Sequence, residues 1–591
     1  MNFNELNSEQ KTAVKQQGNV LLTACPGSGK TRAIIHKLAY ELSILENSDK
    51  KWILALTFTN RVSEEIFRRL NKMGINSTRV WSSTLHSFCL EWIIKPYSCY
   101  LPELNNGYTI ADETYCDDLV SQLKEKHGLK QIDPVNFRFN RDGSFSEIKS
   151  VQRKLLTEYH SILKSEKLID FELLLYYSYL LLKKHPYITK TLSNLFKLIC
   201  VDEYQDTQDL LYAIILLIVK TGNGTSSVFM VGDTDQAIYG SLGGVAKDIT
   251  EIRQELEKLT ISPLKLSGNY RSNQRIIDFY SNFQTNKIKI DALGKNANEK
   301  GIISFNDTIS HTDLVAEISR LIEYSLSNGI DEKEICVLVP QWWLITNITK
   351  KLRASLPNVN FDASGLAPMS KNRNNIWYKL SRLFLTEPSP KIYSTRYRWA
   401  NELIEEFNVH TNTVFNEYYS NPRNLLRLIN SITSDKEEGI EYLEESFNKF
   451  TTEIGINYKE YPMLIENRKL YFENIQNRLN DPTFKVPSDI NSFKSYYREM
   501  NGVVINTCVG VKGEEFETVI AFGLLNGYVP HWNDIFAKTG HDAAMKLLYV
   551  ICSRAKTNLH LISERGRKTK KGTPLVTTPE LNSIKFQYDK V

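Results

Sequence analysis

The chain has 591 residues, enough for several domains, and its 42% hydrophobic and 24% charged residues are typical of a globular protein rather than a disordered one. The net charge of +5 permits a polyanionic partner but does not by itself indicate one. No apolar run is long enough to span a membrane, and the first residues lack the apolar segment of a signal peptide. The eight cysteines form no CxxC pair, which argues against a zinc ribbon or an iron–sulfur centre and suits a reducing, cytoplasmic location.

The first predicted element is a short helix at the sequence LNSEQ, residues 6–10. Gln10 lies about one turn into this helix. Its amide offers a donor and an acceptor, which reading the edge of an adenine requires. Seen alone, Gln10 is more often a solvated helix residue, so both interpretations stay open at this point.

A glycine-rich stretch, LLTACPGSGKTR, runs from Leu21 to Arg32. The apolar run before it predicts a buried strand over residues 19–23, and residues 31–42 have the pattern of a helix. Glycines at positions 27 and 29 let the backbone bend so that successive N–H groups face a polyphosphate, and the helix N-terminus adds partial positive charge there. The stretch therefore predicts a phosphate-binding loop.

Two side chains of this loop carry the expected chemistry. Lys30 supplies a charge for the outer phosphates, and Thr31 supplies a hydroxyl for Mg²⁺. The strict pattern opens with glycine, whereas Ala24 stands at that position. A chance glycine-rich turn is the alternative for the motif taken alone.

A second buried strand is expected over residues 53–60, with a helix over 62–70. The sequence WSSTLHSF follows at residues 81–88. Polar and aromatic side chains at such strand ends and loops can stack on bases and bond phosphates, although ordinary core and turn residues have the same composition. From about 91 to 190 the pattern becomes helical, which predicts an inserted helical subdomain whose basic residues face either a phosphate backbone or solvent.

The sequence LICVDEYQDTQ, residues 198–208, predicts an apolar strand that runs into two acids. A parallel sheet places such residues at its carboxyl edge, beside the phosphate loop. Asp202 can then hold Mg²⁺ through water, and Glu203 can orient and deprotonate an attacking water.

Further blocks follow in order. A strand over residues 228–231 ends in GDTDQ, residues 264–266 lead to the sequence NYRS at 269–272, and two later segments cover 503–519 and 547–556. Together these blocks resemble superfamily 1 helicases of the UvrD/Rep/PcrA group, in the order that this group has them. With the whole set present, a chance phosphate-loop match is excluded.

The resemblance implies an α/β fold of two RecA-like P-loop NTPase domains, each with a mostly helical insertion. Residues 1–90 and 191–268 would form domain 1A, with insertion 1B at 91–190. Residues 269–370 and 501–591 would form domain 2A, with insertion 2B at 371–500 and a basic tail. No nuclease domain is expected after Arg554.

The resemblance also implies ATP and Mg²⁺ as cofactors and assigns roles to individual residues. The expected catalytic residues are Lys30, Asp202, Glu203, Gln236, Arg271 and Arg554, with Thr31 and Asp202 on the metal. The expected nucleotide contacts are Gln10, Ala24, Cys25, Pro26, Gly27, Ser28, Gly29, Lys30, Thr31, Arg32, Tyr270, Arg271, Glu515 and Arg554. In this scheme Tyr270 stacks on the adenine, Gln236 senses the γ-phosphate, and the two arginines stabilise the transferring phosphoryl group.

The expected partner is single-stranded DNA, or DNA with a single-stranded tail, lying across both domains. By resemblance, its contacts are Phe58, Asn60, Thr84, His86, Phe88 and Thr507, and its tracking polarity is 3′ to 5′. This chain departs from the group in several places. Cys25 replaces a glycine, Ser241-Leu242 replace an aromatic residue and arginine, and Val509, Glu514 and Ser553 replace His, Leu and Thr. None of these changes removes a residue of the hydrolytic set.

Three functions remain open from the sequence. The first is an ATP-driven single-stranded DNA translocase and helicase for repair or replication restart. The second is a motor or sensor subunit that works with a separate nuclease, as in bacterial antiviral systems such as Gabija. The third is a nucleic-acid-binding scaffold that hydrolyses ATP poorly.

Overall fold

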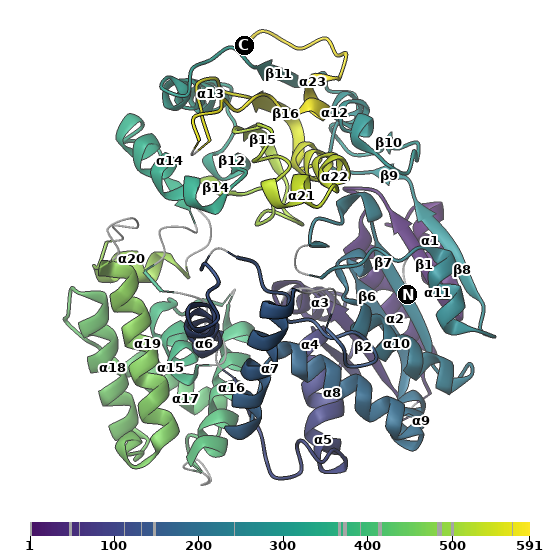
Figure 1. Ribbon diagram of the computed structural model, residues 1–591, viewed down its shortest axis with the longest axis vertical. Helices are drawn as coiled ribbons and strands as arrows, with labels where there is room; N and C mark the ends of the chain where they lie inside the picture. Colours follow the sequence, from purple (N-terminus) through teal and green to yellow (C-terminus); the bar gives the residue numbers. More distant parts are fainter. Residues whose placement is uncertain are drawn as a thin grey trace. The chain divides into compact units, whose positions relative to one another are not determined.

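The computed structural model describes residues 3–46, 50–57, 60–111, 113–131, 133–145, 149–240, 243–363, 368–369, 375–390, 392–411, 417–480, 487–497, 502–569 and 571–591. The chain divides into two compact units. The first consists of Met1–Gly301 and Thr539–Ser553, and the second of Ile302–Lys538 and Arg554–Val591. Each unit is built around its own six-stranded sheet (Figure 1).

The sheet of the first unit is entirely parallel, with strand order β3-β2-β6-β7-β1-β8. Its strands are β1 (Asn19–Ala24), β2 (Trp52–Thr57), β3 (Val80–Thr84), β6 (Phe196–Asp202), β7 (Ser227–Gly232) and β8 (Ile261–Leu266). β1 and β6 both neighbour β7, so the glycine-rich loop after β1 and the two acids after β6 emerge at the same edge.

Alternating side chains of these strands enter two separate hydrophobic clusters. In β1, Val20 and Leu22 pack with helix α2 (Lys30–Ile44), whereas Leu21 belongs to the cluster on the other face. Both faces are covered, which explains why these strands read as continuous apolar runs rather than alternating ones.

The helices of the first unit flank this sheet and form the insertion. Beside the sheet lie α1 (Ser8–Lys15), α2, α3 (Asn60–Lys72), α10 (Asp209–Gly222) and α11 (Ile249–Leu256), and the unit also contains α12 (Gln274–Tyr280) and α22 (Gly540–Cys552). The segment between β3 and β6 contains α4 (Leu85–Phe88), α5 (Lys95–Tyr97), α6 (Glu113–Lys126), α7 (Ser150–Ser165), α8 (Phe171–Lys184) and α9 (Pro186–Leu195). Two two-stranded pairs, β4 (Thr109–Ile110) with β5 (Leu168–Ile169) and β9 (Gly268–Asn269) with β10 (Asp291–Ala292), complete the unit.

The sheet of the second unit is also parallel, in the order β11-β16-β15-β12-β14-β13. Its strands are β11 (Ile302–Asn306), β12 (Ile335–Val339), β13 (Phe361–Ala363), β14 (Val503–Thr507), β15 (Phe516–Ala521) and β16 (Ala555–Ile562). Helices α13 (Leu314–Ser327) and α14 (Trp342–Ser355) pack on one face through a shared apolar cluster, and the short helices α21 (Trp532–Phe536) and α23 (Pro579–Asn582) lie near the end of the chain.

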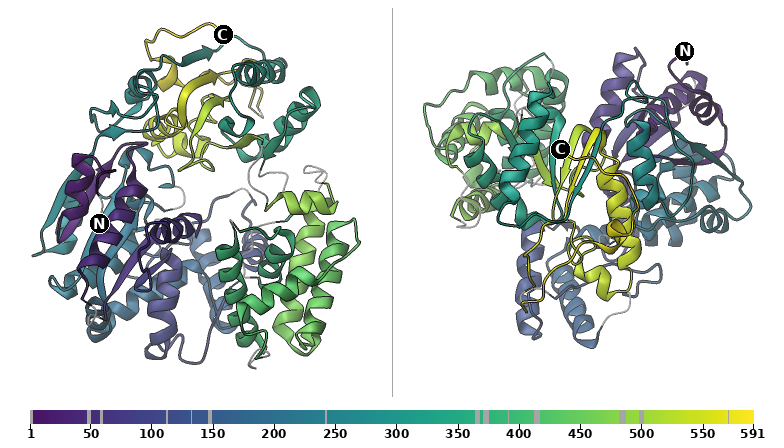
Figure 2. Two further views of the ribbon diagram at one scale, coloured as in Figure 1. Left: turned by 180° about the vertical axis from the view of Figure 1, so that it is seen from behind. Right: turned by 90° about the horizontal axis from the view of Figure 1, so that it is seen from above.

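Between β13 and β14 the second unit carries a helical segment with its own apolar core. Its helices are α15 (Ile376–Leu385), α16 (Tyr393–Thr411), α17 (Pro422–Ser431), α18 (Gly439–Glu453), α19 (Pro462–Asn480) and α20 (Ile490–Ser495). Figures 1 and 2 show these helices side by side as a bundle. The core is rich in aromatic rings, with Trp377 fully buried beside Phe447 at a centroid distance of 5.2 Å.

The C-terminal residues are hydrogen-bonded to the second sheet. The N–H of Asp589 donates to the carbonyl of Ile303 at 2.8 Å, and the Asp589 carboxylate accepts from the Ile303 N–H at 2.9 Å. Thr578 N–H donates to the carbonyl of Leu524. Among the described residues, none of the helices is long and apolar enough to cross a lipid bilayer.

Candidate nucleotide site and nucleic-acid contacts

The loop between β1 and α2 has the backbone that its glycines predict. Gly27 has φ +66°, and Gly29 caps α2 with φ +78° and ψ +34°. A Cβ on Gly27 would lie 2.6 Å from the Cβ of Arg271, and one on Gly29 would lie 2.8 Å from Nε2 of Gln10. Both positions therefore need glycine for two reasons, namely conformation and space.

Lys30 and Glu203 form an ion pair at this edge of the sheet. The Lys30 ammonium lies 3.0 Å from Oε1 and 3.1 Å from Oε2 of Glu203. Burial opposes the charged form of Lys30, but the negative charges of Glu203, Asp233 and Asp202 outweigh burial and raise its pKa. The lysine is therefore a fixed positive charge at the position where a polyphosphate would enter.

Glu203 is positioned by its backbone and by a glutamine. Its φ of +49° lies in the left-handed region, uncommon for a residue with a side chain and frequent at functional turns. Asp202, the last residue of β6, accepts the Glu203 N–H at 3.0 Å, and Gln205 donates its amide to Oε2 of Glu203 at 2.6 Å. Asp202 therefore holds the backbone of Glu203, while Gln205 and Lys30 orient its carboxylate.

Gln205 also connects the Glu203 carboxylate to the end of β7. Its Oε1 accepts the N–H of Asp233 at 3.0 Å, and Gln236 donates its amide to Oδ2 of Asp233 at 2.7 Å. Burial raises the pKa of Asp233 to about 6, although Lys30 acts in the opposite direction. Gln236, Asp233, Gln205 and Glu203 thus form one hydrogen-bonded chain next to Lys30.

Gln10 is fully buried, so it is not a solvated helix residue. Its Nε2 donates to the carbonyl of Ser28 in the phosphate loop at 2.9 Å. Its Oε1 accepts the N–H of Asn7, and the Asn7 side chain donates to the hydroxyl of Tyr270 at 2.9 Å. The geometry brings the two predicted adenine contacts, Gln10 and Tyr270, to one side of the loop, and their role in adenine recognition stays a prediction.

Asn269 is a site residue that the sequence analysis missed. It is fully buried; its Nδ2 donates to the carbonyl of Pro26 at 2.8 Å, while its Oδ1 accepts the N–H groups of Arg271 and Ser272. Tyr270 N–H donates to the carbonyl of Gly27 at 2.9 Å. Asn269 therefore ties the phosphate loop to the segment that carries Arg271, and the signal for it was its place at the start of NYRS.

Arg271 is placed beside the end of α22. Its guanidinium donates to the carbonyl of Ser553 at 2.7 Å, within the first unit. Arg554 and Glu515 belong to the second unit. Arg554 is 1% exposed and donates to the carbonyl of Glu514 at 3.4 Å, whereas Glu515 is exposed. The approach of these two residues to Lys30 stays a prediction.

The remaining loop residues divide into buried and accessible ones. Ala24, Cys25 and Pro26 are buried, and burial raises the pKa of the Cys25 thiol, so it is an inert packing group. Ser28 is buried with no hydrogen-bond partner for its hydroxyl among the described residues, as expected of a loop that binds an oxygen-rich ligand. Arg32 is exposed.

The donor set at this edge suits Mg²⁺ in an ATP complex. Thr31 offers a hydroxyl and Asp202 a carboxylate, both hard oxygen ligands. No cluster of three or more His, Cys, Asp or Glu side chains able to hold a metal occurs among the described residues. Mg²⁺ usually keeps water and phosphate oxygens as ligands and needs only one or two protein ligands.

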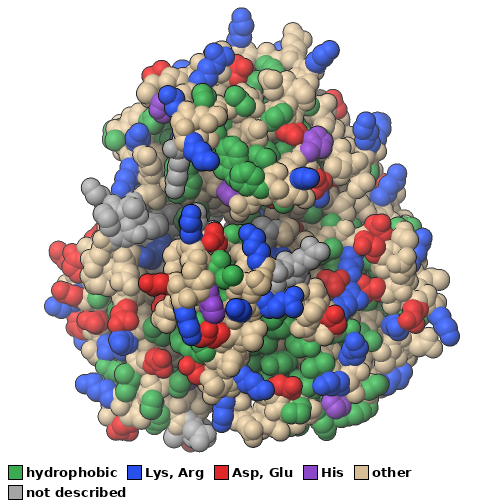
Figure 3. Space-filling model, in the orientation of Figure 1, with side chains coloured by type: hydrophobic (Ala, Val, Ile, Leu, Met, Phe, Trp, Pro, Cys, Tyr) green, Lys and Arg blue, Asp and Glu red, His purple; other side chains and the backbone are tan. Residues whose placement is uncertain are grey.

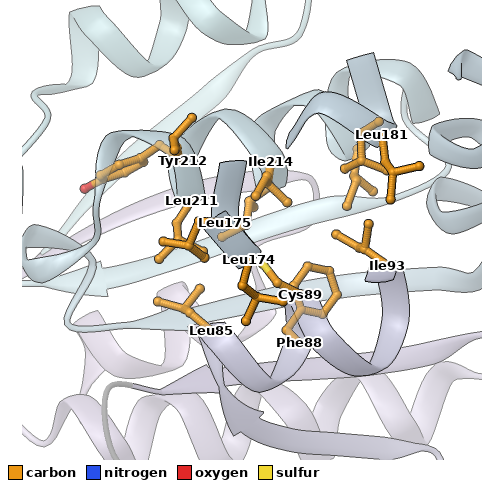
Figure 4. Packing of buried hydrophobic residues seen from close by; sticks show 14 of the residues in the cluster. Leu85, Phe88, Cys89, Ile93, Leu174, Leu175, Leu181, Leu211, Tyr212 and Ile214 are labelled. Atoms are coloured by element: carbon orange, nitrogen blue, oxygen red, sulfur yellow. The ribbon is translucent and has the colours of Figure 1, made fainter. Parts of the chain in front are cut away.

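Phe88 corrects one of the predicted DNA contacts. It is 0% exposed and packs edge-on against Trp81 and at 5.9 Å from Phe196. Figure 4 shows it beside Cys89 and Leu174, inside the cluster that joins α4 to α8. A ring without exposed surface cannot stack on a base, so Phe88 is a core residue. The prediction for Phe88 was wrong because the sequence alone does not distinguish an aromatic ring that stacks on a base from one that packs in the core.

The other predicted DNA contacts have varied surroundings. The Thr84 hydroxyl caps α4 by accepting the N–H of Ser87 at 3.2 Å. His86 packs edge-on against Phe171, and burial lowers its pKa to about 4, so it is uncharged near neutral pH. Thr507 ends β14 and accepts the N–H of Gly510 at 2.9 Å. Phe58, the side chain of Asn60, and the pair Ser241-Leu242 lie outside the described residues.

Two exposed tryptophans follow β12 and were missed from the sequence. Trp342 is 48% exposed and Trp343 is 60% exposed, and the Trp343 ring lies edge-on to Tyr528. β12 pairs with β14 through Val339 and Thr507, so the tryptophans start from the same edge of the sheet as Thr507. Their signal was a Trp-Trp pair directly after a buried strand. Side chains of both charges lie among the described residues on the face shown in Figure 3.

These features define a P-loop NTPase: a strand, a glycine-rich loop with Lys30, a helix, and Asp202-Glu203 at the same edge of a parallel sheet. Residues 6–257 match the model of the UvrD/REP helicase N-terminal domain. The chain is UvrD/Rep/PcrA-like, with two RecA-like α/β domains, as its motifs predicted.

Curated relatives extend the similarity beyond this domain. The chain is 25% identical to a protein named ATP-dependent DNA helicase PcrA from Staphylococcus aureus (strain Mu50 / ATCC 700699), over 96% of this chain and 84% of the relative. PcrA of S. epidermidis (strain ATCC 35984) is also 25% identical, over 95% of this chain and 84% of the relative. PcrA of S. aureus strain MRSA252 is 28% identical over 57% of this chain and 48% of the relative.

Proposed function

We propose that this protein is an ATP-dependent single-stranded DNA translocase and helicase that moves 3′ to 5′. The observation that carries the proposal is the Lys30–Glu203 ion pair, with Glu203 oriented by Asp202 and Gln205. A fixed cation and an oriented carboxylate are what phosphoanhydride hydrolysis by water requires. The similarity to proteins named ATP-dependent DNA helicase PcrA supports DNA as the partner.

In the proposed mechanism ATP and Mg²⁺ bind at the phosphate loop. Lys30 would exchange Glu203 for a phosphate oxygen, and the freed Glu203 would accept a proton from the attacking water. Thr31 and Asp202 would hold Mg²⁺, which would supply positive charge to the phosphates. Gln236 would respond to the γ-phosphate through Asp233 and Gln205, because these residues form one hydrogen-bonded chain to Glu203, in which Asp233 takes part through its carboxylate and its backbone N–H.

Arg271 and Arg554 complete the mechanism by stabilising charge on the transferring phosphoryl group. Arg271 comes from the first unit and Arg554 from the second, so ATP would favour their joint engagement and product release would end it. The single-stranded DNA partner would contact Thr84 and Thr507, and the exposed rings of Trp342 and Trp343 would offer stacking surfaces.

A second function is favoured by the sequence at Ser241-Leu242, where this group commonly has an aromatic residue and arginine. Loss of a stacking ring would weaken strand tracking without touching hydrolysis. In that case the protein is the ATPase and DNA-sensing subunit of a nuclease-containing defence complex, with weak unwinding of its own.

Strand displacement on duplexes with a 3′ or a 5′ single-stranded tail tests the proposal. We expect ATP-dependent displacement with the 3′ tail and none with the 5′ tail, and Lys30→Ala as the inactive control. ATP turnover that rises with single-stranded DNA but displaces neither strand would favour the second function. Turnover that does not respond to DNA would contradict both.

A further inference from the structure

The helical insertion of the first unit contains a pocket of about 620 Å³. Its lining comes from residues 103–108, from Phe139 and Phe145, from α7, from residues 167–169 and from α8. Residues 139–145 form a small hairpin, with a bridge between Phe139 and Phe145 and a hydrogen bond from Asn140 N–H to the Ser144 carbonyl. The volume lies within the range of pockets that bind small molecules.

Aromatic rings line one part of the pocket. Phe139 and Tyr176 stack at 4.8 Å with an interplanar angle of 19°, and Phe145 stacks on His160 at 5.4 Å and 11°. Tyr177 lines the same space. These rings pack on one another, since Phe139 also lies 5.0 Å from Phe145 and 4.9 Å from His160, and together they make one apolar wall on which a planar aromatic ligand can stack.

Lysines dominate the charge around the pocket. Lys164, Lys167 and Lys184 line it, against a single acid, Glu103. Lys164 and Lys184 are exposed, so their ammonium groups can reach an anion at the mouth, whereas Lys167 donates to the carbonyl of Asn106. The ligand that complements this pocket therefore combines a flat ring with a negative charge.

His160 supplies a hydrogen-bonding group in the pocket wall. Both of its ring nitrogens are buried and have no hydrogen-bond partner among the described residues. Burial lowers the pKa of His160, so the ring is neutral and carries one donor and one acceptor. Buried polar atoms without partners are uncommon and costly, and a ligand edge with an acceptor and a donor would satisfy them.

The hairpin wall is also connected to the nucleotide site. Arg141, at its tip, donates to both carboxylate oxygens of Asp209 at 2.6 and 2.8 Å and to Glu255 at 2.8 Å. Asp209 is the first residue of α10, which directly follows the sequence DEYQDTQ, and Lys247 pairs with Asp209 at 2.6 Å. A ligand that presses on Phe139 and Phe145 therefore acts on an element that is anchored to the first residue of α10.

We propose that this pocket binds a nucleotide, with the base stacked on the aromatic wall beside His160 and the phosphate at Lys164 and Lys184, and that its occupancy alters ATP turnover through Arg141. The choice of a nucleotide, rather than another anionic aromatic compound, rests on the proposed function in nucleic-acid transactions. The nucleotide is either free or an unpaired residue of a bound strand, and the experiment separates these two sources.

The test uses the full chain with its phosphate loop saturated by a nonhydrolysable ATP analogue and Mg²⁺. Thymidine 5′-monophosphate is titrated by calorimetry, and a (dT)16 oligonucleotide by fluorescence anisotropy. The pocket variant is Lys164→Ala with Lys184→Ala. The matched control is Lys154→Ala with Lys183→Ala, exposed lysines of the same two helices that do not line the pocket.

We expect the pocket variant to bind at least one of the two probes with an affinity that is lower by tenfold or more. The control variant should bind both probes with affinities within twofold of those of the unsubstituted protein. Loss of thymidine monophosphate binding identifies a free nucleotide, and loss confined to (dT)16 identifies an unpaired base of a strand. Equal effects in the two variants, or no binding of either probe by the unsubstituted protein, would overturn the proposal.

Two further variants test the chemistry in detail. His160→Phe keeps the stacked ring but removes its nitrogens, so it should reduce the preference for thymidine monophosphate over deoxyribose 5-phosphate by tenfold or more. The Arg141→Gln variant should bind the pocket ligand with an affinity within twofold of that of the unsubstituted protein. The bound ligand should, however, no longer change the rate of ATP turnover in this variant. An unchanged preference or an unchanged effect would contradict these assignments. Strand displacement by the unsubstituted protein tests the proposed helicase function separately. The pocket proposal and the helicase proposal can therefore be contradicted independently of one another.

Discussion

At the scale of single residues, the central feature is a cation and a carboxylate that neutralise one another until a ligand separates them. Lys30 and Glu203 are paired at 3.0 Å, and both lie at the carboxyl edge of the first sheet. A phosphate can replace the carboxylate on the lysine and leave Glu203 as a base. The pairing of Lys30 with Glu203 thereby places both groups where hydrolysis would need them.

Glu203→Gln tests the role of that base. The glutamine can still accept hydrogen bonds from Gln205 and the loop, so ATP affinity should stay within about threefold. Hydrolysis should fall by about 10² to 10⁴, the usual contribution of a general base. Single-turnover hydrolysis together with equilibrium binding of a fluorescent ATP analogue measures both quantities. A loss of binding instead would show that Glu203 has a structural role.

Asp233→Asn tests the charge beside this pair. Because burial raises the pKa of Asp233 to about 6, the folded state holds its proton more tightly than the unfolded chain. The stability that this carboxyl contributes is present below about pH 4 and is lost as the pH rises through 6. We therefore expect Asp233→Asn to raise the thermal unfolding midpoint more at pH 7.5 than at pH 5. An equal change at both values would contradict the assignment.

At the scale of elements, the loop after β1 depends on glycines whose neighbours come from distant parts of the first unit. Gly29→Ala should weaken ATP binding by about tenfold or more, because a side chain in the left-handed region costs about 1–2 kcal/mol and the methyl group would also meet Gln10. Gly74→Ala is the control, since it shares the positive φ but has open space around it. Equal ATP affinities in the two variants would contradict the packing argument.

Helix α4 provides the second test at this scale. Phe88→Ala should destabilise the first unit by about 3–5 kcal/mol, the usual cost of emptying a buried phenylalanine site. DNA affinity of the folded fraction should stay unchanged, because the ring has no exposed surface. Chemical unfolding and anisotropy with single-stranded DNA measure the two effects. A selective loss of DNA affinity at unchanged stability would return Phe88 to the DNA contacts.

The sequence was most informative where the local pattern and the chemistry agree. The apolar run before the loop predicted a strand over 19–23, and the structure has β1 at Asn19–Ala24. The residues at the ends of β1 and β6 could be predicted because parallel strands bring their carboxyl ends together. Asn269 could not be predicted, because its importance depends on a tertiary contact with the carbonyl of Pro26.

Burial was the second limit of the sequence analysis. Phe88 and Trp343 are both aromatic residues close to the end of a strand, yet one is in the core and the other is 60% exposed. Composition and spacing are the same in the two cases, and only the packing of α8 over α4 separates them. Residues that track a nucleic acid are therefore harder to predict than residues that bind phosphate, whose backbone requirements are visible in the sequence.

At the scale of the whole molecule, the proposed motor depends on two units that each carry part of the hydrolytic set. Lys30, Glu203 and Arg271 belong to the first unit, and Arg554 belongs to the second. Helix α22, which directly precedes Arg554, belongs to the first unit, where its Tyr549 packs edge-on against Tyr280. The chain thus passes from one unit to the other at the residue predicted to complete the site.

The most direct measurement of this account is single-turnover ATP hydrolysis by Arg554→Lys in the presence of single-stranded DNA. Because lysine keeps the charge but loses the planar fork of donors, we predict a loss of about 10³-fold in the hydrolysis rate. ATP affinity should stay within about threefold of that of the unsubstituted protein. Hydrolysis at an undiminished rate would contradict the claim that the second unit contributes an arginine to the reaction.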